Sequence, residues 1–472
     1  WLMMSLWDAL RMNMMISYQE LVRTFPKFRK VKLCEILSFK TGKLDSNAAV
    51  DNGCYPFFTC SPVTLSINTH AFDTEAVLLA GNNANGVFSV KYYNGKFNAY
   101  QRTYVITPLD NSEVNVKWLY FRIKYVTSEL QSMSVGTATK FLTKKILDAF
   151  EIELPTFEEQ TYQAQILWAL QDKLANNEAI NQTLEQMAQA LFKTWFVDFE
   201  PVKAKMAALE AGGSQEDAML AAMTAISGKD VNALAIFERE HPAQYAELKA
   251  TAELFPSAMQ DSELGAIPKG WRGASISEMG KVICGKTPSK KEPEYYGSDV
   301  PFIKIPDMHG QLFVLKTNEY LSEVGSKSQL KKLVPANSIC VSCIATIGVV
   351  SITNEPSHTN QQINSVTPHK SSLLYYLYFC MLGLKDHLHA LGSAGSATLN
   401  VNTSTFSGIK IAQPDAKVLE LFHAKCTHLF NEIKSLSVQT ESLTQLRDTL
   451  LPKLLSGEIT LPEAEQIISE EA

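Results

Sequence analysis

An internal repeat is the feature of this sequence that most constrains its fold. Residues 136–155 (GTATKFLTKKILDAFEIELP) align without a gap with residues 395–414 (GSATLNVNTSTFSGIKIAQP), at an offset of about 259 residues. The same offset places residues 184–199 on residues 443–458. Solenoid repeats have periods of roughly 20–50 residues, so this period is far too long for one. The sequence therefore predicts a tandem duplication of a whole domain together with the helix that follows it.

Upstream of these matches, the two copies keep the same order of segments but differ in the length of their insertions. Residues 76–90 match residues 338–352 and residues 101–108 match residues 361–368, with offsets that drift between about 243 and 262. β-branched and aromatic runs predict strands, and short apolar-periodic runs predict helices. The predicted strands are residues 76–79, 104–106, 338–341 and 348–352, and the predicted helices are residues 116–125 and 372–382. Each copy is therefore expected to be an α+β domain.

Each copy closes with a long helix in which a set of mostly apolar positions recurs about every 3.5 residues. The recurring positions are Leu167, Leu170, Leu174, Asn177, Asn181, Leu184, Ala188, Leu191 and Trp195 in the first copy, and Phe422, Cys426, Leu429, Ile433, Leu436, Thr440, Leu443, Arg447, Leu450 and Leu454 in the second. This spacing predicts a coiled coil whose register is fixed by Asn177 and Asn181. If a pseudo-twofold axis relates the copies, the helices run antiparallel, and about 40 helical residues, roughly 60 Å, separate the two domains. A helical hairpin used only for dimerisation is the alternative.

These patterns divide the chain into consecutive segments. They are an N-terminal extension of uncertain structure (1–30), an α+β domain (31–155), a coiled-coil helix (156–200), a connector (201–268), a second α+β domain (269–414), a second coiled-coil helix (415–460) and an acidic tail (461–472). The connector is rich in Ala, Glu and Met and is interrupted at Gly212-Gly213 and His241-Pro242. It is expected to form two or three short helices.

The charge of the chain is distributed unevenly between these segments. The formal net charge is -6, which argues against a protein that grips nucleic acid along its whole length. Residues 1–155, which include the first α+β domain, and residues 269–414, the second, carry net charges of about +4 and +5, whereas each long helical segment and the connector carry about -5. One such segment could arise by chance, but the same sign in both copies favours two domains that bind a polyanion.

Motifs of known enzymes fail in their sequence context. Residues 280–287 (GKVICGKT) match the phosphate-binding pattern G-x-x-x-x-G-K-[ST], but Pro288 and Pro293 lie where that motif needs a helix. Cys340 and Cys343 have metal-site spacing but lie in an alternating strand pattern with no second Cys or His pair nearby. No Gly-x-Ser-x-Gly nucleophile elbow and no Asn-Pro-Pro-aromatic motif occurs. The chain is therefore predicted to have no catalytic residues, no metal site and no cofactor of its own.

Polar side chains that suit nucleic acid cluster where loops leave the predicted strands. Asn and Gln pair with adenine and Arg or Lys with guanine in the major groove, while Ser and Thr suit phosphates. The candidates are Asn82, Asn83, Gln101, Arg102, Thr139 and Lys140 in the first copy, and Lys304, Asn360, Gln361, Gln362, Thr398 and Asn400 in the second. The alternative for each residue is that it only makes a turn.

Several motifs together resemble a known family. They are the G-[ST]-A-T pattern at the start of the last segment of each domain (residues 136–155 and 395–414), Glu159-Gln160, residues 192–205 (FKTWFVDFEPVKAK) and residues 446–459 (LRDTLLPKLLSGEI). Over about residues 31–460 the chain resembles the specificity subunit of type I restriction–modification systems. The second helix departs from the pattern, because Asp415-Ala416-Lys417 stands where the Glu-Gln pair would be.

The resemblance implies two tandem α+β target recognition domains, each reading one half of a bipartite double-stranded DNA sequence. It also implies that the antiparallel coiled coil binds two adenine methyltransferase subunits, with restriction and motor subunits outside. S-adenosylmethionine, ATP and magnesium would belong to those partners. The residues expected to contact partners are Leu191, Phe192, Trp195, Phe196, Leu450, Leu454 and Leu455.

Two further expectations concern location and the competing function. The longest uncharged apolar run, residues 373–384, is too short to span a bilayer, and no signal peptide is visible, so a cytoplasmic protein without membrane contact is expected. The alternative function is a coiled-coil adaptor whose domains bind protein. The sequence does not predict the recognised bases, the spacer length or the loops that touch DNA.

Overall fold

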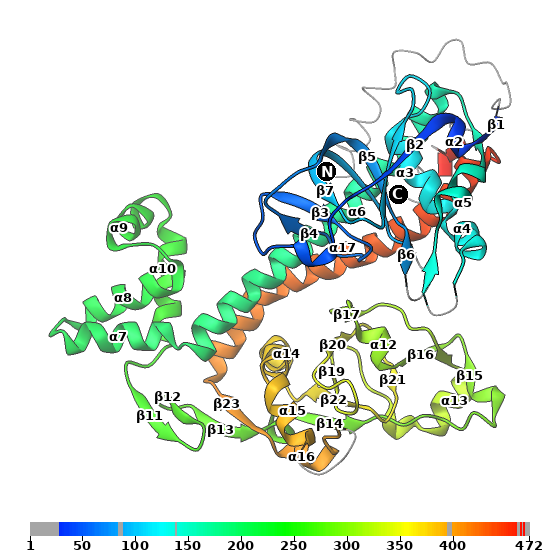
Figure 1. Cartoon of the computed structure of the whole chain (residues 1–472). Helices are drawn as coiled ribbons and strands as arrows, with labels where there is room; N and C mark the ends of the chain where they lie inside the picture. The colour runs from blue at the N-terminus through cyan, green and yellow to red at the C-terminus, as the bar shows by residue number, and fades with distance from the viewer. Residues whose placement is uncertain are drawn as a thin grey trace. The chain divides into compact units, whose positions relative to one another are not determined.

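The computed structural model describes residues 28–83, 88–136, 139–393, 399–459, 463–464 and 466–467 (Figure 1). These residues belong to two compact units, the first made of residues up to 177 together with those from 439 onward, and the second of residues 178–438. Two long helices, α6 (Phe157–Phe192) and α17 (Ala416–Ser456), contribute to both units. Thr398 and most of the acidic tail lie outside the described residues.

The first domain is built on a six-stranded sheet. Its strand order is β2 (Leu37–Thr41), β8 (Thr103–Pro108), β5 (Phe72–Ala80), β7 (Val90–Ala99), β3 (Tyr55–Phe58) and β4 (Leu65–Ile67). All neighbours are antiparallel except β3 and β7, which run parallel. Helix α3 (Val116–Tyr125) contributes to the core of the domain, and α4 (Thr127–Met133) follows it. The predicted strands 76–79 and 104–106 and the predicted helix 116–125 are thereby confirmed.

The second domain contains two larger sheets among its described residues. One has the order β14 (Gly280–Cys284), β22 (Ile363–Pro368), β19 (Ile339–Ser342), β20 (Val350–Thr353) and β17 (Phe313–Val314), and the other has the order β15 (Tyr296–Gly297), β18 (Tyr320–Leu321), β16 (Val300–Ile303) and β21 (His358–Thr359). Strand β20 begins two residues later than predicted, because the turn before it includes Ala345 and Gly348 with positive φ angles. The predicted helix 372–382 is α14 (Leu374–Gly383), which a 3₁₀ turn at Ser371–Leu373 precedes.

Matching hydrogen bonds in the two domains confirm the duplication. In the first domain β1 (Arg29–Lys32) pairs with β10 (Glu151–Leu154), and in the second β13 (Arg272–Ser275) pairs with β23 (Lys410–Gln413). The amide of Leu33, which opens α2 (Leu33–Ile36), donates to the Phe150 carbonyl at 2.9 Å. Its counterpart Ile276 opens α11 (Ile276–Met279) and donates to the Ile409 carbonyl at 3.0 Å. Each long helix thus begins directly after a strand that closes its own domain.

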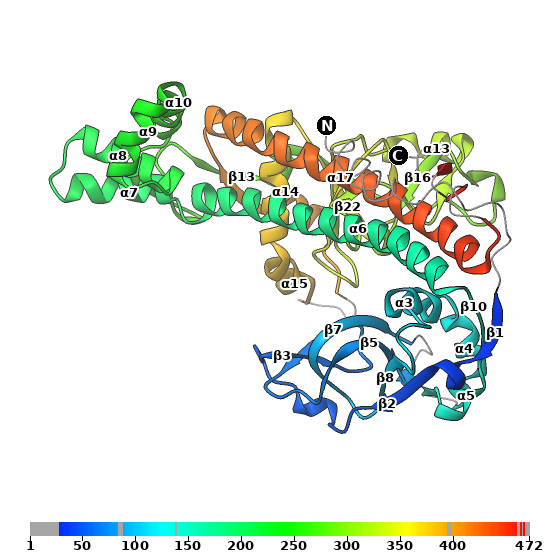
Figure 2. The same cartoon turned by 90° about the horizontal axis from the view of Figure 1, so that it is seen from above.

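The two long helices pack side by side and run antiparallel (Figure 2). In the first unit Gln163 Nε2 donates to the Leu454 carbonyl at 2.9 Å, and the fully buried Asn177 donates to Gln439 Oε1 at 2.9 Å. In the second unit Asn181 Nδ2 donates to Ser437 Oγ at 3.3 Å. Both seam asparagines therefore bond across the helix pair, as expected of buried polar residues that fix register. The pseudo-twofold relation of the copies stays a prediction.

The connector holds more structure than expected. Its helices are α7 (Glu200–Glu210), α8 (Gln215–Ser227), α9 (Val231–Glu240) and α10 (Pro242–Glu253), and the hairpin β11 (Met259–Ser262) and β12 (Gly265–Pro268) follows. The prediction of two or three helices was wrong, because Gly228 with φ 68° ends α8 and the side chain of Asp230 caps α9. No single helix among the described residues is long and apolar enough to cross a membrane. Helices α8 and α9 together meet these length and composition criteria, but they are bent by 84° at the break between them.

Candidate nucleic-acid interface

Hydrogen bonds at the start of β8 fix the backbone of the Gln101-Arg102 turn and join it to neighbouring segments. The amide of Thr103 donates to the Tyr100 carbonyl at 2.9 Å, and the amide of Gly81 donates to the Arg102 carbonyl at 2.7 Å. The amide of Leu142 in turn donates to the Gly81 carbonyl at 2.9 Å. A Cβ atom at Gly81 would lie 2.5 Å from the Arg102 carbonyl oxygen, so only glycine permits this approach.

A short two-stranded sheet places the remaining candidates of the first domain beside the Gln101-Arg102 turn. Strand β6 (Asn82–Asn83) pairs with β9 (Lys140–Phe141), so that Asn82 lies opposite Phe141 and Asn83 opposite Lys140. Thr139 directly precedes β9, and Cys60 Sγ lies 2.9 Å from Asn82 Oδ1. The six candidates of the first domain, which come from three separated segments, therefore lie around one site.

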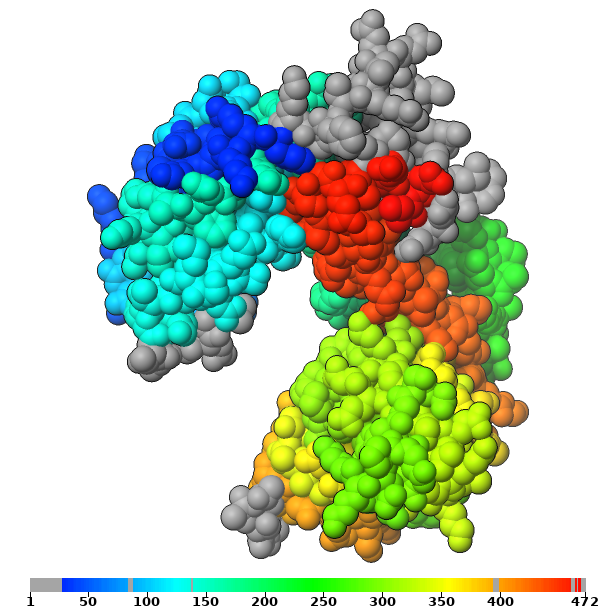
Figure 3. Space-filling model, turned by 90° about the vertical axis from the view of Figure 1, so that its right-hand side faces the viewer, coloured from blue at the N-terminus to red at the C-terminus, as the bar shows by residue number. Residues whose placement is uncertain are grey.

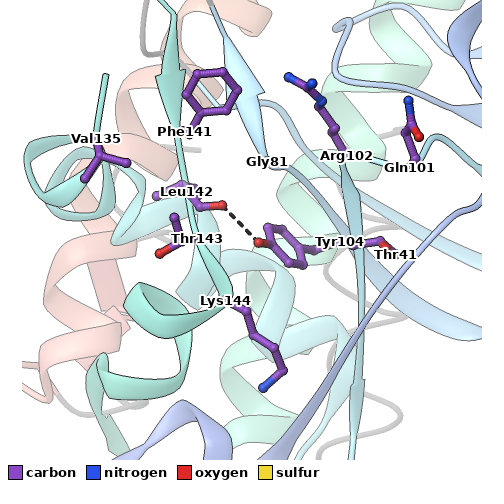
Figure 4. A pocket seen from close by; sticks show the side chains of 10 residues that line it. All are labelled: Thr41, Gly81, Gln101, Arg102, Tyr104, Val135, Phe141, Leu142, Thr143 and Lys144. Carbon is purple, nitrogen blue, oxygen red and sulfur yellow. Dashed lines mark hydrogen bonds between the residues drawn. The ribbon is translucent and has the colours of Figure 1, made fainter. Parts of the chain in front are cut away.

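An open cavity of about 490 Å³ lies at this site (Figure 4). It is lined by Thr41, Gly81, Gln101, Arg102, Tyr104, Val135, Phe141, Leu142, Thr143 and Lys144. The Arg102 guanidinium lies over the Phe141 ring, 5.5 Å from its centroid, and the Tyr104 hydroxyl donates to the Leu142 carbonyl at 2.9 Å. Burial, and secondarily the charge of Asp148, raises the pKa of Tyr104, so its hydroxyl remains a donor at neutral pH. The wall thus combines aromatic faces with cationic and amide groups.

The second domain repeats this framework with different side chains. The amide of Cys343 donates to the Gln362 carbonyl at 2.8 Å, and the amide of Val401 donates to the Cys343 carbonyl at 2.9 Å. A bridge between Ile344 and Asn400 takes the place of the ladder between β6 and β9. Gln361-Gln362 therefore occupies the position of Gln101-Arg102, and Asn400 lies beside it.

The polar side chains of the second domain are engaged with one another. Asn360 Nδ2 donates to Gln362 Oε1 at 3.0 Å, and Thr287 Oγ1 donates to Gln361 Oε1 at 2.6 Å. Lys304 lies next in the chain to Ile303, whose carbonyl accepts from the Asn360 amide at 3.1 Å. Its ammonium forms an ion pair with Glu319 and lies 5.4 Å from the centroid of the Phe302 ring. The charge of Lys304 is therefore compensated within the domain.

The structure also lacks the local geometry that the two rejected motifs, the phosphate-binding pattern and the Cys340–Cys343 pair, would need for their chemistry. Residues 285–292, which follow β14, are not helical, so no helix N-terminus meets the phosphate-binding pattern. Cys340 and Cys343 are buried, and burial raises the pKa of both thiols to about 11. Within the described ranges, no group of three or more His, Cys, Asp or Glu residues could hold a metal ion.

The residues expected to bind partners at the helix ends lie mostly in the chain's own cores. Trp195 and Phe196 are buried among aromatic residues of the second domain, with Phe196 5.0 Å from Tyr376 between ring centroids. Leu450, Leu454 and Leu455 are likewise buried in the core of the first domain, and Leu191 and Phe192 are half-buried. Figure 3 shows the end of α17, in red, against the first domain. Internal packing accounts for these apolar side chains, and their contact with a partner stays a prediction.

Three buried polar residues that anchor the first domain to the helices were not singled out as site residues. Gln160 accepts from the Asn115 amide at 2.9 Å and donates to the Glu113 and Pro155 carbonyls at 3.0 Å each. Gln163 accepts from the Trp118 indole at 2.8 Å, and Arg122 donates to the Leu455 carbonyl at 3.3 Å. Gln160 belongs to the Glu-Gln pair of the family motif, which was the one signal available in the sequence.

Known proteins are similar to this chain in sequence. The chain matches the type I restriction modification DNA specificity domain family over residues 27–186 and 268–435. It is 48% identical over 325 residues to the specificity subunit of the type I restriction enzyme HindI of Haemophilus influenzae, which covers 67% of this chain and 71% of that protein. It is 42% identical over 164 residues to the EcoDI specificity subunit of Escherichia coli, which covers 35% of each.

The fold has a counterpart of lower sequence similarity. The S subunit of a type I restriction–modification system from M. genitalium aligns with a TM-score of 0.57 and 13% identity, covering 93% of this chain and 98% of that one. This likeness supports the arrangement of α+β domains and long helices. The sequence match supplies the family, and the chain belongs to the type I restriction modification DNA specificity domain family.

Proposed function

We propose that this chain is the DNA-reading specificity subunit of a type I restriction–modification complex, in which each α+β domain reads one half of a bipartite sequence. The observation that carries the proposal is the repeated framework. The same backbone hydrogen bonds hold Arg102 in the first domain and Gln362 in the second, while the side chains differ. A backbone framework that is repeated in both domains but carries different base-pairing side chains suits two half-sites of different sequence.

Charge supports the same function. The second domain carries a net charge of about +5, and residues 1–155, which include the first domain and the segment before it, carry about +4, on a chain that is acidic overall. Phosphate contacts supply most of the sequence-independent affinity for DNA, and they need this excess of Lys and Arg. The acidic helices and connector are unsuited to the DNA backbone, so we assign them to spacing the domains and to binding protein partners.

The partners in this proposal are two adenine methyltransferase subunits, with restriction and motor subunits outside them. S-adenosylmethionine, ATP and magnesium then belong to those subunits, and the reaction takes place on a target adenine that the methyltransferase extrudes from the duplex. The helix pair is the proposed scaffold for them. Met187 and Val438 are large apolar residues on its exposed surface in the second unit, and they are candidates for such a contact.

Mapping of methylated adenines across the genome tests the proposal in cells that produce the chain and in cells that lack it. We expect a bipartite methylated sequence that disappears when the chain is removed. An unchanged methylation pattern would refute the proposal.

A salt titration separates the DNA reader from the protein-binding adaptor. The assembled complex should lose affinity for its target duplex steeply as salt rises, because phosphate contacts release counterions. An adaptor would show no such affinity for DNA at any salt concentration.

A further inference from the structure

Arg102 differs from the other described arginines of the two domains in what its guanidinium contacts. Each of the others has an acceptor within the chain: Arg29 has Glu113, Arg272 has Glu278 at 2.9 Å, and Arg122 has the Leu455 carbonyl at 3.3 Å. Arg102 is exposed, and no carboxylate or carbonyl in the described part of the chain accepts from its side chain. Its donors are therefore available to a ligand.

The position of Arg102 is fixed although its donors are available. Its carbonyl is held by the Gly81 amide, and its guanidinium lies over the Phe141 ring of β9, 5.5 Å from the ring centroid. In Figure 4 the Arg102 guanidinium points toward the side on which the Phe141 ring lies. A guanidinium is planar and carries its N–H groups at the edge of the plane, where they form a fork that matches two adjacent acceptors.

The acceptor pair that fits this fork in duplex DNA belongs to guanine. Guanine presents O6 and N7 side by side in the major groove, and a bidentate arginine is the commonest contact to them. Gln101 Nε2 is already bonded to Asp45 Oδ2 at 3.2 Å, and Lys144 is paired with Asp148 at 2.6 Å. Arg102 is thus the cation on the cavity wall that remains open to such a contact.

The matching position of the second domain carries a different chemistry. Gln362 has its backbone held in the same way, but its side chain is an amide and accepts from Asn360 Nδ2 at 3.0 Å. An amide offers one donor and one acceptor edge, which pairs with adenine and not with the two acceptors of guanine.

We infer that Arg102 reads a guanine in the half-site bound by the first domain, and that the second domain reads no guanine from the matching position. This inference rests on the proposed function and names the base that one residue of that site recognises. Arg102 acts as a specificity-determining residue through its two parallel N–H donors.

The test is methylation mapping in cells whose chain carries Arg102→Gln, which places the residue of the second domain in the first. One guanine of the first half-site should lose its preference over the other bases by roughly five- to 150-fold, while the other half-site and the spacer stay unchanged. Exchange of residues 269–414 for the same domain of a relative identifies the half-sites, because the half that persists belongs to the first domain.

Two further variants protect the test against a folding defect. Arg102→Lys keeps the charge but loses the planar fork, so it should weaken the preference for the same guanine, and by less than Arg102→Gln does, because a lysine ammonium still donates to guanine. Lys140→Gln removes a neighbouring charge and should lower methylation evenly without changing the sequence.

The outcomes distinguish the inference from the proposed function. If the wild-type chain directs no bipartite methylation, the proposed function fails. If bipartite methylation is present, the inference alone is overturned by any of three results. These are a first half-site without guanine, a guanine preference that survives both Arg102 variants, and an even loss of methylation with the sequence unchanged.

Discussion

Trp195 and Leu454 occupy matching positions of the two repeats, and each is fully buried in the core of the domain that belongs to the other repeat. Trp195, at the end of the first helix, packs against Phe422 and Phe255 of the second unit, with ring centroids 6.2 Å and 5.2 Å away. Leu454, at the end of the second helix, lies in the core built by α3 and β10 of the first unit. Each domain is therefore completed by the helix of the other copy.

Removal of the Leu454 side chain should destabilise the first domain selectively. Leu454→Ala leaves a cavity in a closed core, which costs about 2–5 kcal/mol of unfolding free energy. Hydrogen exchange followed by mass spectrometry should show faster exchange in β5 and β8 and unchanged exchange in β19 and β22. Val438→Ala, at an exposed position of α17, is the matched control and should change neither domain. Equal acceleration in both domains would contradict the account.

The corresponding variant in the first repeat, Trp195→Ala, should destabilise the second domain selectively. Trp195→Ala removes the largest side chain of the π-helical turn Lys193–Val197 that follows α6, and it should lower the unfolding free energy of the second domain by about 3–5 kcal/mol. Exchange should now accelerate in β19 and β22 while β5 and β8 keep their protection. Val197→Ala, two residues away and exposed, serves as the control. Loss of protection in the first domain alone would show that Trp195 does not complete the second core.

Gln160 should be indispensable to the junction between the first domain and α6. Gln160→Leu keeps the volume but leaves the Asn115 amide and the Glu113 and Pro155 carbonyls without their partner, which should cost about 2–4 kcal/mol. Chemical denaturation monitored at the first domain measures this loss. Gln165→Leu changes an exposed glutamine of the same helix and should be nearly neutral. Similar stability of both variants would mean that the three hydrogen bonds contribute little.

His358 should make the second domain less stable in mild acid. The imidazole is fully buried, with Ser326 Oγ 2.9 Å from Nε2, and burial lowers the pKa of His358 to about 4. Below the ordinary pKa of about 6.5 the unfolded chain takes up a proton that the folded chain excludes. The neutral His358 side chain therefore does not lower the free energy of unfolding above pH 6.5. As the pH approaches 4, this free energy falls by about 3 kcal/mol.

Denaturation at several pH values measures this dependence. His358→Asn should flatten the loss of second-domain stability between pH 6.5 and 4, whatever its stability at neutral pH. His309→Gln replaces an exposed histidine and should keep the wild-type dependence. If the stability of the His358 variant depends on pH as strongly as that of the wild type, other titrating groups cause the loss.

The duplication and the long helices could be predicted because both are periodic features of the sequence. The 259-residue offset predicted that matching segments, ending at Pro155 and Pro414, would close the two domains before the helices, and the 3.5-residue spacing predicted the positions of Asn177 and Asn181 on the seam. The reciprocal insertion of Trp195 and Leu454 was not predicted. An apolar helix end has the same pattern whether it packs in its own chain or on a partner, so the sequence favoured a partner site equally well.

The candidate site was predictable in its residue types but not in its assembly. Loops rich in Asn, Gln and Arg indicated base-reading chemistry, yet only the pairing of β6 with β9 shows that Asn82, Arg102 and Lys140 share one site. The ion pair that compensates Lys304 was invisible, because Glu319 lies fifteen residues away in the chain and reaches it through the sheet. Long-range pairing of this kind leaves no local pattern.

The most direct test of the central claim is an exchange of one domain followed by methylation mapping. Residues 269–414 are replaced by the same domain of a relative, because a deletion would expose Trp195 and Phe196 and confound the result with misfolding. The account predicts that one half of the methylated bipartite sequence changes to the relative's half-site while the other half stays the same. An unchanged sequence, or a change in both halves, would contradict it.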